Sequence, residues 1–120
     1  MQTLEQIGPK SIEWAAGLFE GEGTIYRVRS SKTPRWCIRI KMTDLDVLED
    51  FHATVGRGNL NGPHHSPSMK PHHKPFWHWE TNKKDDVITV LSSLKPFLGY
   101  RRSKLVNSCL QDYGVDYATD

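Results

Sequence analysis

Residues 14–25 of the chain read Trp14-Ala15-Ala16-Gly17-Leu18-Phe19-Glu20-Gly21-Glu22-Gly23-Thr24-Ile25. Ser11 can cap a helix through this stretch, and Gly21 and Gly23 are expected to end it. Gly17 and Gly21 are four residues apart, so they lie on one face of the helix. Small residues on such a face let two helix backbones approach closely. The sequence has one such stretch, so we expect the partner helix to come from a second copy of the chain in a C2 dimer.

A carboxylate follows the expected end of this helix. Glu22 would lie beside the main-chain carbonyl of Gly21, which the helix end leaves without a helical partner. Oxygen donors of this kind suit a hard cation such as Mg²⁺. The alternative is a solvated acid after a glycine-capped helix.

The remaining sequence predicts an α+β layer fold in one domain, residues 1–120. Further helices are expected from Thr43 or Asp44 to residue 55, from Asp85 or Asp86 to residue 94, and over residues 102–113. Alternation and turn residues predict strands over residues 24–29, 35–42, 59–61 and 76–81. This order suits helices segregated on one face of an antiparallel sheet, with the other face open.

The second strand alternates without a break. One face carries Trp36, Ile38, Ile40 and Met42, and the other carries Arg35, Cys37, Arg39 and Lys41. The apolar face is expected to join the core together with the four tryptophans. The basic face is then a candidate surface for a nucleic acid.

Charge is unevenly distributed, although the net charge is only +2. Acids are absent between Glu22 and Asp44 and between Asp50 and Glu80, and the second gap holds all six histidines. Such segregation predicts one basic face, which suits a polyanion. An ordinary solvated surface is the alternative.

Other classes of protein fit poorly. No apolar run approaches the ~20 residues of a membrane span, and the first residues lack a signal-peptide core. Cys37 and Cys109 stand alone, which argues against a disulfide framework or a zinc ribbon. His64-His65 and His72-His73 lack standard zinc-ligand spacing. We therefore expect an intracellular protein with no membrane partner and no zinc.

The stretch quoted above resembles the LAGLIDADG motif, after which a family of homing endonucleases is named. Ala16, Gly17, Leu18 and Gly23 match the motif, and Glu20 and Glu22 stand at its two Asp positions. Further segments resemble the family in the same order: residues 38–48, Gly56-Arg57-Gly58-Asn59-Leu60, and Lys95-Pro96-Phe97-Leu98 with Arg101 and Arg102.

The resemblance implies the αββαββα fold, with the sheet forming a saddle. It implies a homodimer that cleaves both strands of a long, near-palindromic double-stranded DNA site, in the service of intron or intein mobility. Glu22 would be catalytic and a metal ligand, with Gly21 as a second ligand and Mg²⁺, replaceable by Mn²⁺, as cofactor. Arg101 would stabilise charge at the scissile phosphate. The implied dimer interface comprises Trp14, Gly17, Leu18, Glu20 and Gly21.

DNA contacts are expected along the open face and its loops. The set is Tyr26, Val28, Arg29, Ser30, Lys32, Arg35, Cys37, Arg39, Lys41, Asn59, Asn61, Lys70, His78 and Glu80. The face of the first strand stays open between two readings. The family register favours Tyr26 and Val28, whereas the charge pattern favours Arg27 and Arg29.

One departure from the family pattern favours a second hypothesis. Met42 stands where the family often has a polar Gln near the catalytic water. A LAGLIDADG-fold protein that binds nucleic acid without cleaving it, such as an intron maturase or a transcription regulator, is therefore the alternative. RNA would be a partner only of a maturase.

Overall fold

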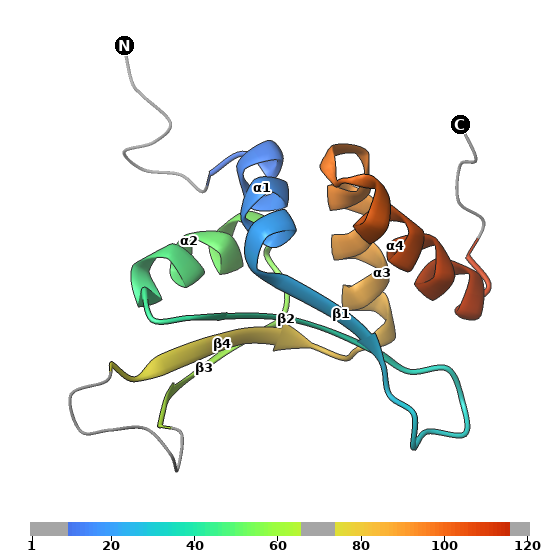
Figure 1. Cartoon of the computed structure of the whole chain (residues 1–120), viewed down its shortest axis with the longest axis horizontal. Helices are drawn as coiled ribbons and strands as arrows, with labels where there is room; N and C mark the ends of the chain where they lie inside the picture. The colour runs from blue at the N-terminus through green and yellow to red at the C-terminus, as the bar shows by residue number, and fades with distance from the viewer. Residues whose placement is uncertain (1–9, 66–73, 116–120) are drawn as a thin grey trace.

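The computed structural model describes residues 10–65 and 74–115. Four α-helices cover one side of a sheet of four strands, and the opposite side of the sheet is open (Figure 1). The elements in chain order are α1 (Ile12–Glu22), β1 (Gly23–Arg27), β2 (Trp36–Met42), α2 (Leu45–Val55), β3 (Asn59–His64), β4 (Phe76–Thr81), α3 (Lys84–Leu94), the short 3₁₀ helix η2 (Lys95–Phe97) and α4 (Tyr100–Asp112). The predicted α+β class and element order are confirmed.

Helix α1 leads directly into the sheet. The Ser11 hydroxyl accepts a hydrogen bond from the Trp14 amide at 3.0 Å, which confirms the predicted N-cap. Of the two glycines predicted to end the helix, Gly23 is confirmed and Gly21 is wrong, because the helix continues through Glu22. Gly23 ends it in an extended conformation while its amide donates to the Phe19 carbonyl. A Cβ at Gly23 would lie 2.5 Å from the Phe19 ring, so this junction requires glycine.

The sheet has the strand order β1-β2-β4-β3, and every neighbouring pair is antiparallel. The two long strands β2 and β4 lie at the centre, with Ile40 opposite Trp79. Strand β3 runs through His64 and is longer than predicted, with an irregularity between Asn61 and His64. Strand β1 ends at Arg27, two residues earlier than predicted, although the Val28 amide still donates to the Arg35 carbonyl at 2.8 Å.

The core lies between the sheet and the helices. Ile38, Ile40 and Trp79 point from the central strands to the helical side and are fully buried. Trp79 meets the Phe51 ring of α2 edge to face, at 4.8 Å between centroids. Its indole nitrogen donates to the Arg57 carbonyl at 2.8 Å, which satisfies the only polar group of the ring. This apolar layer uses every second strand residue and leaves the others for the open face.

The remaining helices depart slightly from their predicted limits. Asp44 is the N-cap residue of α2, and Gly56 closes this helix at a positive φ of 69°. Helices α3 and α4 begin one to two residues earlier than predicted, at Lys84 and Tyr100. No helix of the described residues is both long and apolar enough to cross a membrane.

Candidate nucleic-acid interface and active site

The open face of the sheet carries polar side chains in rows across the strands. Cross-strand partners project to the same side of an antiparallel sheet. One row crosses all four strands through Thr24, Arg39, Glu80 and Asn59. The next row comprises Lys41, His78 and Asn61, and a third joins Tyr26 to Cys37. The predicted division of β2 into an apolar and a polar face is therefore observed, and β4 is divided in the same way.

Hydrogen bonds link these rows into a network. Arg39 Nε and Nη2 lie 3.0 and 2.9 Å from Glu80 Oε1, while Asn61 Nδ2 donates to Glu80 Oε2 at 3.1 Å. The Asn61 amide oxygen lies 2.7 Å from His64 Nε2. Four side chains from three strands thus hold one another in fixed orientations at the centre of the open face.

The network sets the protonation of its members. Burial raises the pKa of Glu80, but hydrogen bonds from Asn61 and Arg39 outweigh this effect, so the pKa lies below its ordinary value. Burial followed by the charge of Arg39 lowers the pKa of His78. At neutral pH the centre of the face therefore presents a carboxylate paired with a guanidinium, beside a neutral imidazole.

Aromatic side chains border the network toward β4. The His78 ring lies 4.8 Å from the His64 ring and 5.4 Å from the Phe76 ring. Lys41 Nζ lies 4.2 Å from the Phe76 ring centroid, within the range of a cation–π contact. This contact positions an exposed ammonium group above the open face.

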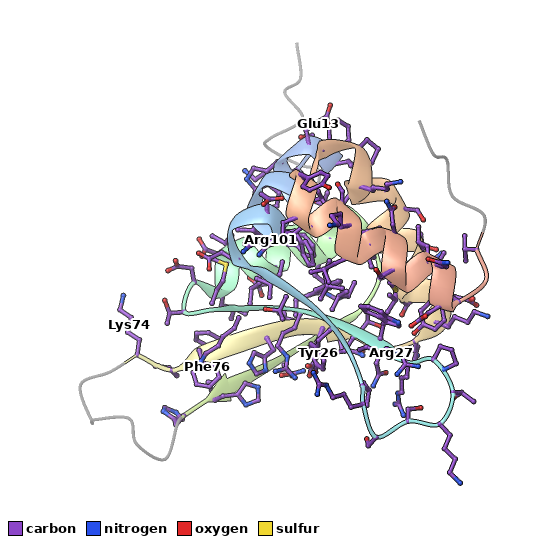
Figure 2. All side chains as sticks on the ribbon, turned by 45° about the vertical axis from the view of Figure 1, so that its right-hand side comes forward. Glu13, Tyr26, Arg27, Lys74, Phe76 and Arg101 are labelled. Atoms are coloured by element: carbon purple, nitrogen blue, oxygen red, sulfur yellow. The ribbon has the colours of Figure 1, made fainter. Side chains whose placement is uncertain are left out.

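The structure settles which side of β1 faces outward. Tyr26 lies on the open face, and a hydrogen bond with the Cys37 thiol, followed by burial, raises its pKa. Arg27 lies on the helical side, where its Nε is 2.9 Å from Asp112 Oδ2 of α4. Figure 2 shows Tyr26 and Arg27 diverging from the strand. Of the two readings left open by the sequence, the one with Tyr26 outward holds within β1.

The other expected DNA contacts divide into three groups. Val28, Arg29, Ser30 and Lys32 lie in the β1–β2 connection, and Arg35 just precedes β2. Cys37 is on the open face but only 7% exposed, beneath its neighbours, which leaves little of it for a base to contact. Lys70 lies outside the described residues.

A cavity of about 560 Å³ adjoins this connection. Its lining includes the cations Arg35, Lys83 and Lys84 together with Ser31 and Thr33. The two lysines were not predicted as contacts, because in the sequence they belong only to the start of a helix. Their nearness to Arg35 depends on the packing of α3 against the sheet.

Glu22 lies at the edge of the open face. It is exposed in the last turn of α1 and shares a cavity of about 310 Å³ with Lys41, Met42, Thr43, Asp44 and Phe76. Within residues 10–65 and 74–115, the Glu22 side chain has no hydrogen-bond or ion-pair partner. The final carbonyls of a helix also lack helical donors and carry partial negative charge, and Gly21 belongs to this turn. The result is a concentration of free oxygen donors beside an exposed lysine.

Helix α4 begins next to the end of α1. Glu20 Oε1 accepts a hydrogen bond from the Gly99 amide at 2.7 Å, and Arg102 Nη2 donates to the Gly23 carbonyl at 2.7 Å. Arg101 is exposed in the first turn of α4, and Figure 2 shows it close to the end of α1. Arg101 was predicted as a site residue from the sequence, whereas Arg102 was not, because its contact joins residues 79 positions apart.

The outer face of α1 has an uncovered strip. A Cβ at Gly17 or Gly21 would meet nothing within 4 Å, so both glycines are open to a neighbour. Trp14 and Leu18 flank them and pack partly against the core. Glu20, also predicted at the dimer interface, bonds to the start of α4 in its own chain.

Solved structures share this architecture. The homing endonuclease I-CvuI, in complex with its target in the presence of calcium, superposes with a TM-score of 0.65 at 15% identity over 87% of this chain. The group I intron-encoded homing endonuclease I-CeuI, complexed with DNA, superposes with a TM-score of 0.63 at 13% identity over 83% of this chain. The homing endonuclease I-TnaI superposes with a TM-score of 0.60 at 17% sequence identity. The match covers 88% of this chain and 76% of I-TnaI. Among the similar structures is a LAGLIDADG meganuclease, I-AabMI, bound to uncleaved DNA.

This chain has the LAGLIDADG homing-endonuclease fold. The resemblance seen in the sequence is thereby confirmed at the level of the fold. No family model and no curated protein matches the sequence. The chain spans 66% of the length of I-CvuI and 52% of that of I-CeuI.

The LAGLIDADG fold explains why the candidate residues are where they are. Helix α1, which carries the motif, ends at the edge of the sheet, so Glu22 lies at the margin of the open face. The described residues contain no group of three or more His, Cys, Asp or Glu side chains that could hold a metal ion. Any metal bound at Glu22 would therefore need further oxygen donors from main-chain carbonyls, water, a phosphate or a second protomer.

Proposed function

We propose that the chain is a site-specific, metal-dependent DNA endonuclease that acts as a homodimer. The observation that carries this proposal is the position of Glu22. An exposed carboxylate with no partner in the described part of the chain stands where the motif helix meets a polar, open sheet face. An acid whose only role is to be solvated would not have to line a cavity together with Lys41 at the margin of a polar sheet face.

The open face supplies the surface for double-stranded DNA. A ribbon of strands fits the major groove, and an arginine such as Arg39 can pair with a guanine edge. The face offers both hydrogen-bond donors and hydrogen-bond acceptors, because amide, imidazole, carboxylate and guanidinium groups lie in adjacent rows. Arg29, Lys32 and Arg35 would contact phosphates beyond the end of the sheet.

The donor set fits Mg²⁺, with Mn²⁺ as a substitute. The Glu22 carboxylate and the Gly21 carbonyl are hard oxygen donors, and the negative end of the α1 dipole favours a cation there. When bound, such an ion lowers the pKa of a water molecule and stabilises the leaving oxygen. Glu22 would hold the ion, and Arg101 would stabilise charge on the scissile phosphate. Each protomer would cut one strand.

The dimer would form through α1. Gly17 and Gly21 are uncovered and four residues apart, which allows close approach of the same helix from a second protomer. Trp14 and Leu18 would add apolar contacts beside the glycines. A C2 axis through this contact would bring the two Glu22 carboxylates together and present the reading face twice, so the target should be nearly palindromic.

A second candidate is a DNA- or RNA-binding protein that does not cleave, either an intron maturase or a transcription regulator. The observation that favours it is Met42, which lines the Glu22 cavity. A thioether is at best a weak acceptor, so it does not orient a water molecule as an amide would.

One experiment separates the two candidates. A plasmid library is treated with the full chain and Mg²⁺ or Mn²⁺, cut ends are sequenced, and the enriched site is used for binding and nicking. Glu22→Gln should lose cleavage by several orders of magnitude while the dissociation constant (Kd) stays the same or falls, since a charge near phosphates is removed. Glu49→Gln removes the same charge from an exposed position on α2 and serves as the control.

Two results would count against the endonuclease. Specific binding without cleavage by the wild-type protein in either metal would establish the binding-protein candidate. Cleavage by Glu22→Gln at near the wild-type rate would place the active site elsewhere.

A further inference from the structure

Two hydrogen bonds join the end of α1 to the start of α4. One runs from the Gly99 amide to Glu20 Oε1, and the other from Arg102 Nη2 to the Gly23 carbonyl, each at 2.7 Å. Arg102 Nη1 also lies 3.7 Å from Glu20 Oε2. Both donors belong to the start of α4 and both acceptors to the end of α1, so two separate points of each element are tied together.

The carboxylate of Glu20 accepts from the amide of the N-cap residue of α4, as the acidic residue of a capping box does, whereas Arg102 stands at that helical position in α4. Gly99 is the N-cap residue of α4 and has no side chain that could accept from the first helical amides. Glu20 brings an oxygen to the Gly99 amide from another element, and its negative charge lies at the positive end of the α4 dipole. A Cβ at Gly99 would lie 3.3 Å from Glu20 Oε2, so the glycine leaves the space that this carboxylate uses.

The Arg102 side chain is mostly buried, unlike that of a typical surface arginine. Its side chain is 15% exposed, and its Nε is buried without a partner. A buried, unpaired donor is unfavourable, and a simple surface arginine would avoid it. The side chain is thus held where its terminal nitrogens can reach both Gly23 and Glu20.

The two ties flank the two residues assigned to chemistry. Glu20 and Gly23 enclose Glu22 in the chain, and Gly99 and Arg102 enclose Arg101 in the same way. The main chain beneath each proposed catalytic group is therefore anchored on both sides to the element that carries the other one.

We propose that Glu20 and Arg102 are positioning residues that fix the Glu22 carboxylate relative to the Arg101 guanidinium. This inference rests on the proposed function. It gives Glu20 a role within its own protomer, different from the role at the dimer interface that the sequence suggested. It also separates the adjacent arginines, because Arg101 would face the phosphate while Arg102 holds the scaffold.

The test compares variants under single-turnover conditions with saturating protein. Arg102→Met removes the charge and the donors, whereas Arg102→Lys keeps one donor group. Glu20→Ala removes the acceptor at Gly99, whereas Glu20→Gln keeps an amide oxygen there. The matched control is Arg57→Met, which breaks the 3.1 Å ion pair between Arg57, in the connection from α2 to β3, and Asp86 of α3. Rate, Kd and melting temperature are measured for each protein.

Loss of positioning should lower the cleavage rate and leave affinity unchanged. We expect Arg102→Met and Glu20→Ala to cut about 10- to 100-fold more slowly at saturation, as displacements near 1 Å can do. Kd should stay within about twofold, because neither side chain lies on the open face. The conservative variants should recover most of the rate, and Arg57→Met should lower the melting temperature without slowing cleavage.

The outcomes are distinguishable. A wild-type protein that does not cut overturns the proposed function and the positioning role with it. A wild type that cuts, with Arg102→Met and Glu20→Ala cutting equally fast once bound, overturns the positioning role alone. If Arg102→Met does not fold, the Glu20→Ala and Glu20→Gln pair decides, since the Glu20 side chain is 41% exposed and its truncation leaves no large cavity in the core.

Discussion

Arg39 and Glu80 face each other across β2 and β4, and two nitrogens of the guanidinium approach the same carboxylate oxygen at 3.0 and 2.9 Å. The other oxygen of Glu80 accepts from Asn61 at 3.1 Å. The carboxylate therefore limits the orientation of Arg39 and cancels its charge in the free protein. A DNA base that accepts a hydrogen bond from Arg39 would therefore meet a guanidinium whose orientation Glu80 has already fixed.

Truncation of the two members of this pair should affect DNA binding in opposite directions. Glu80→Ala releases Arg39, so binding to unrelated DNA should strengthen while discrimination at the contacted base pair falls by about 1–3 kcal/mol. Arg39→Ala leaves the Glu80 carboxylate without its guanidinium partner near phosphates and should weaken all binding. Kd values for the selected site and a scrambled site, at one salt concentration, measure both effects. The double variant should bind better than Arg39→Ala alone, and strict additivity would contradict the coupling.

The dimer prediction concerns Gly17. Gly17→Leu should abolish cleavage, because the side chain would separate two α1 helices, while the protomer keeps its fold since nothing lies within 4 Å of the added Cβ. Ala53→Leu introduces the same side chain at an exposed position of α2 and is the control. Sedimentation with and without DNA, together with cleavage, tests the idea. A strictly monomeric wild type that cuts both strands would refute it.

Stability should respond to acid in two stages. The pKa of His78 is lowered, so below its ordinary value of 6.5 the unfolded chain binds the proton more readily and stability falls. The pKa of Glu80 is also lowered, so its contribution is complete above its ordinary value of 4.5 and is lost as pH falls through the folded value. Urea unfolding between pH 7 and pH 3.5 measures both stages. His78→Gln should flatten the first stage and Glu80→Gln the second.

Both cysteines should be unreactive in the folded protein. Burial raises the pKa of Cys109 to about 12, so only about one thiol in 10⁴ is ionised at pH 8. Cys37 is 7% exposed beneath the open face. Titration with a thiol reagent should find no fast-reacting group before denaturant is added and two afterwards. Rapid labelling of either cysteine in the native protein would contradict the described packing.

The length of the sheet predicts the length of the site. Strand β2 has seven residues, and at ~3.3 Å per residue it spans ~23 Å, or about seven base pairs. Two protomers and the gap between them should therefore protect about 20 base pairs. Binding should weaken steeply with salt, and Lys41→Ala should reduce the slope of log K against log salt by about one if Lys41 neutralises one phosphate. A footprint under ten base pairs would exclude the dimer.

The sequence predicted the fold well because its signals are local and strongly periodic. Alternation in β2 separated Ile38 and Ile40 from Arg39 and Lys41, and the structure keeps that separation. Limits of elements were less accurate at Gly21, since glycine tolerates the last turn of a helix and does not force its end. The outward face of β1 could not be assigned from charge, because Arg27 is neutralised by Asp112, 85 residues away.

The candidate site was predictable only in part for the same reason. Glu22 and Arg101 could be proposed from the sequence, because each stands at a position where the motif or its neighbouring segments lead one to expect an acid or a base. The pairing of Arg39 with Glu80, and the ties made by Glu20 and Arg102, arise from contacts between distant segments. Such contacts depend on register and packing, which no single stretch of sequence encodes.

The hydrogen-bonded chain from Arg39 through Glu80 and Asn61 to His64 would limit how a DNA-binding protein built on this face can acquire a new target. Exchange of one member leaves its neighbour with an unmatched charge or lone pair, so stepwise change passes through intermediates that discriminate poorly between sites. Thr24 and Lys41 stand outside this chain of bonds and can vary singly. Directed evolution should therefore diversify the four linked positions as one block, and retargeting by single exchanges should succeed first at the independent positions.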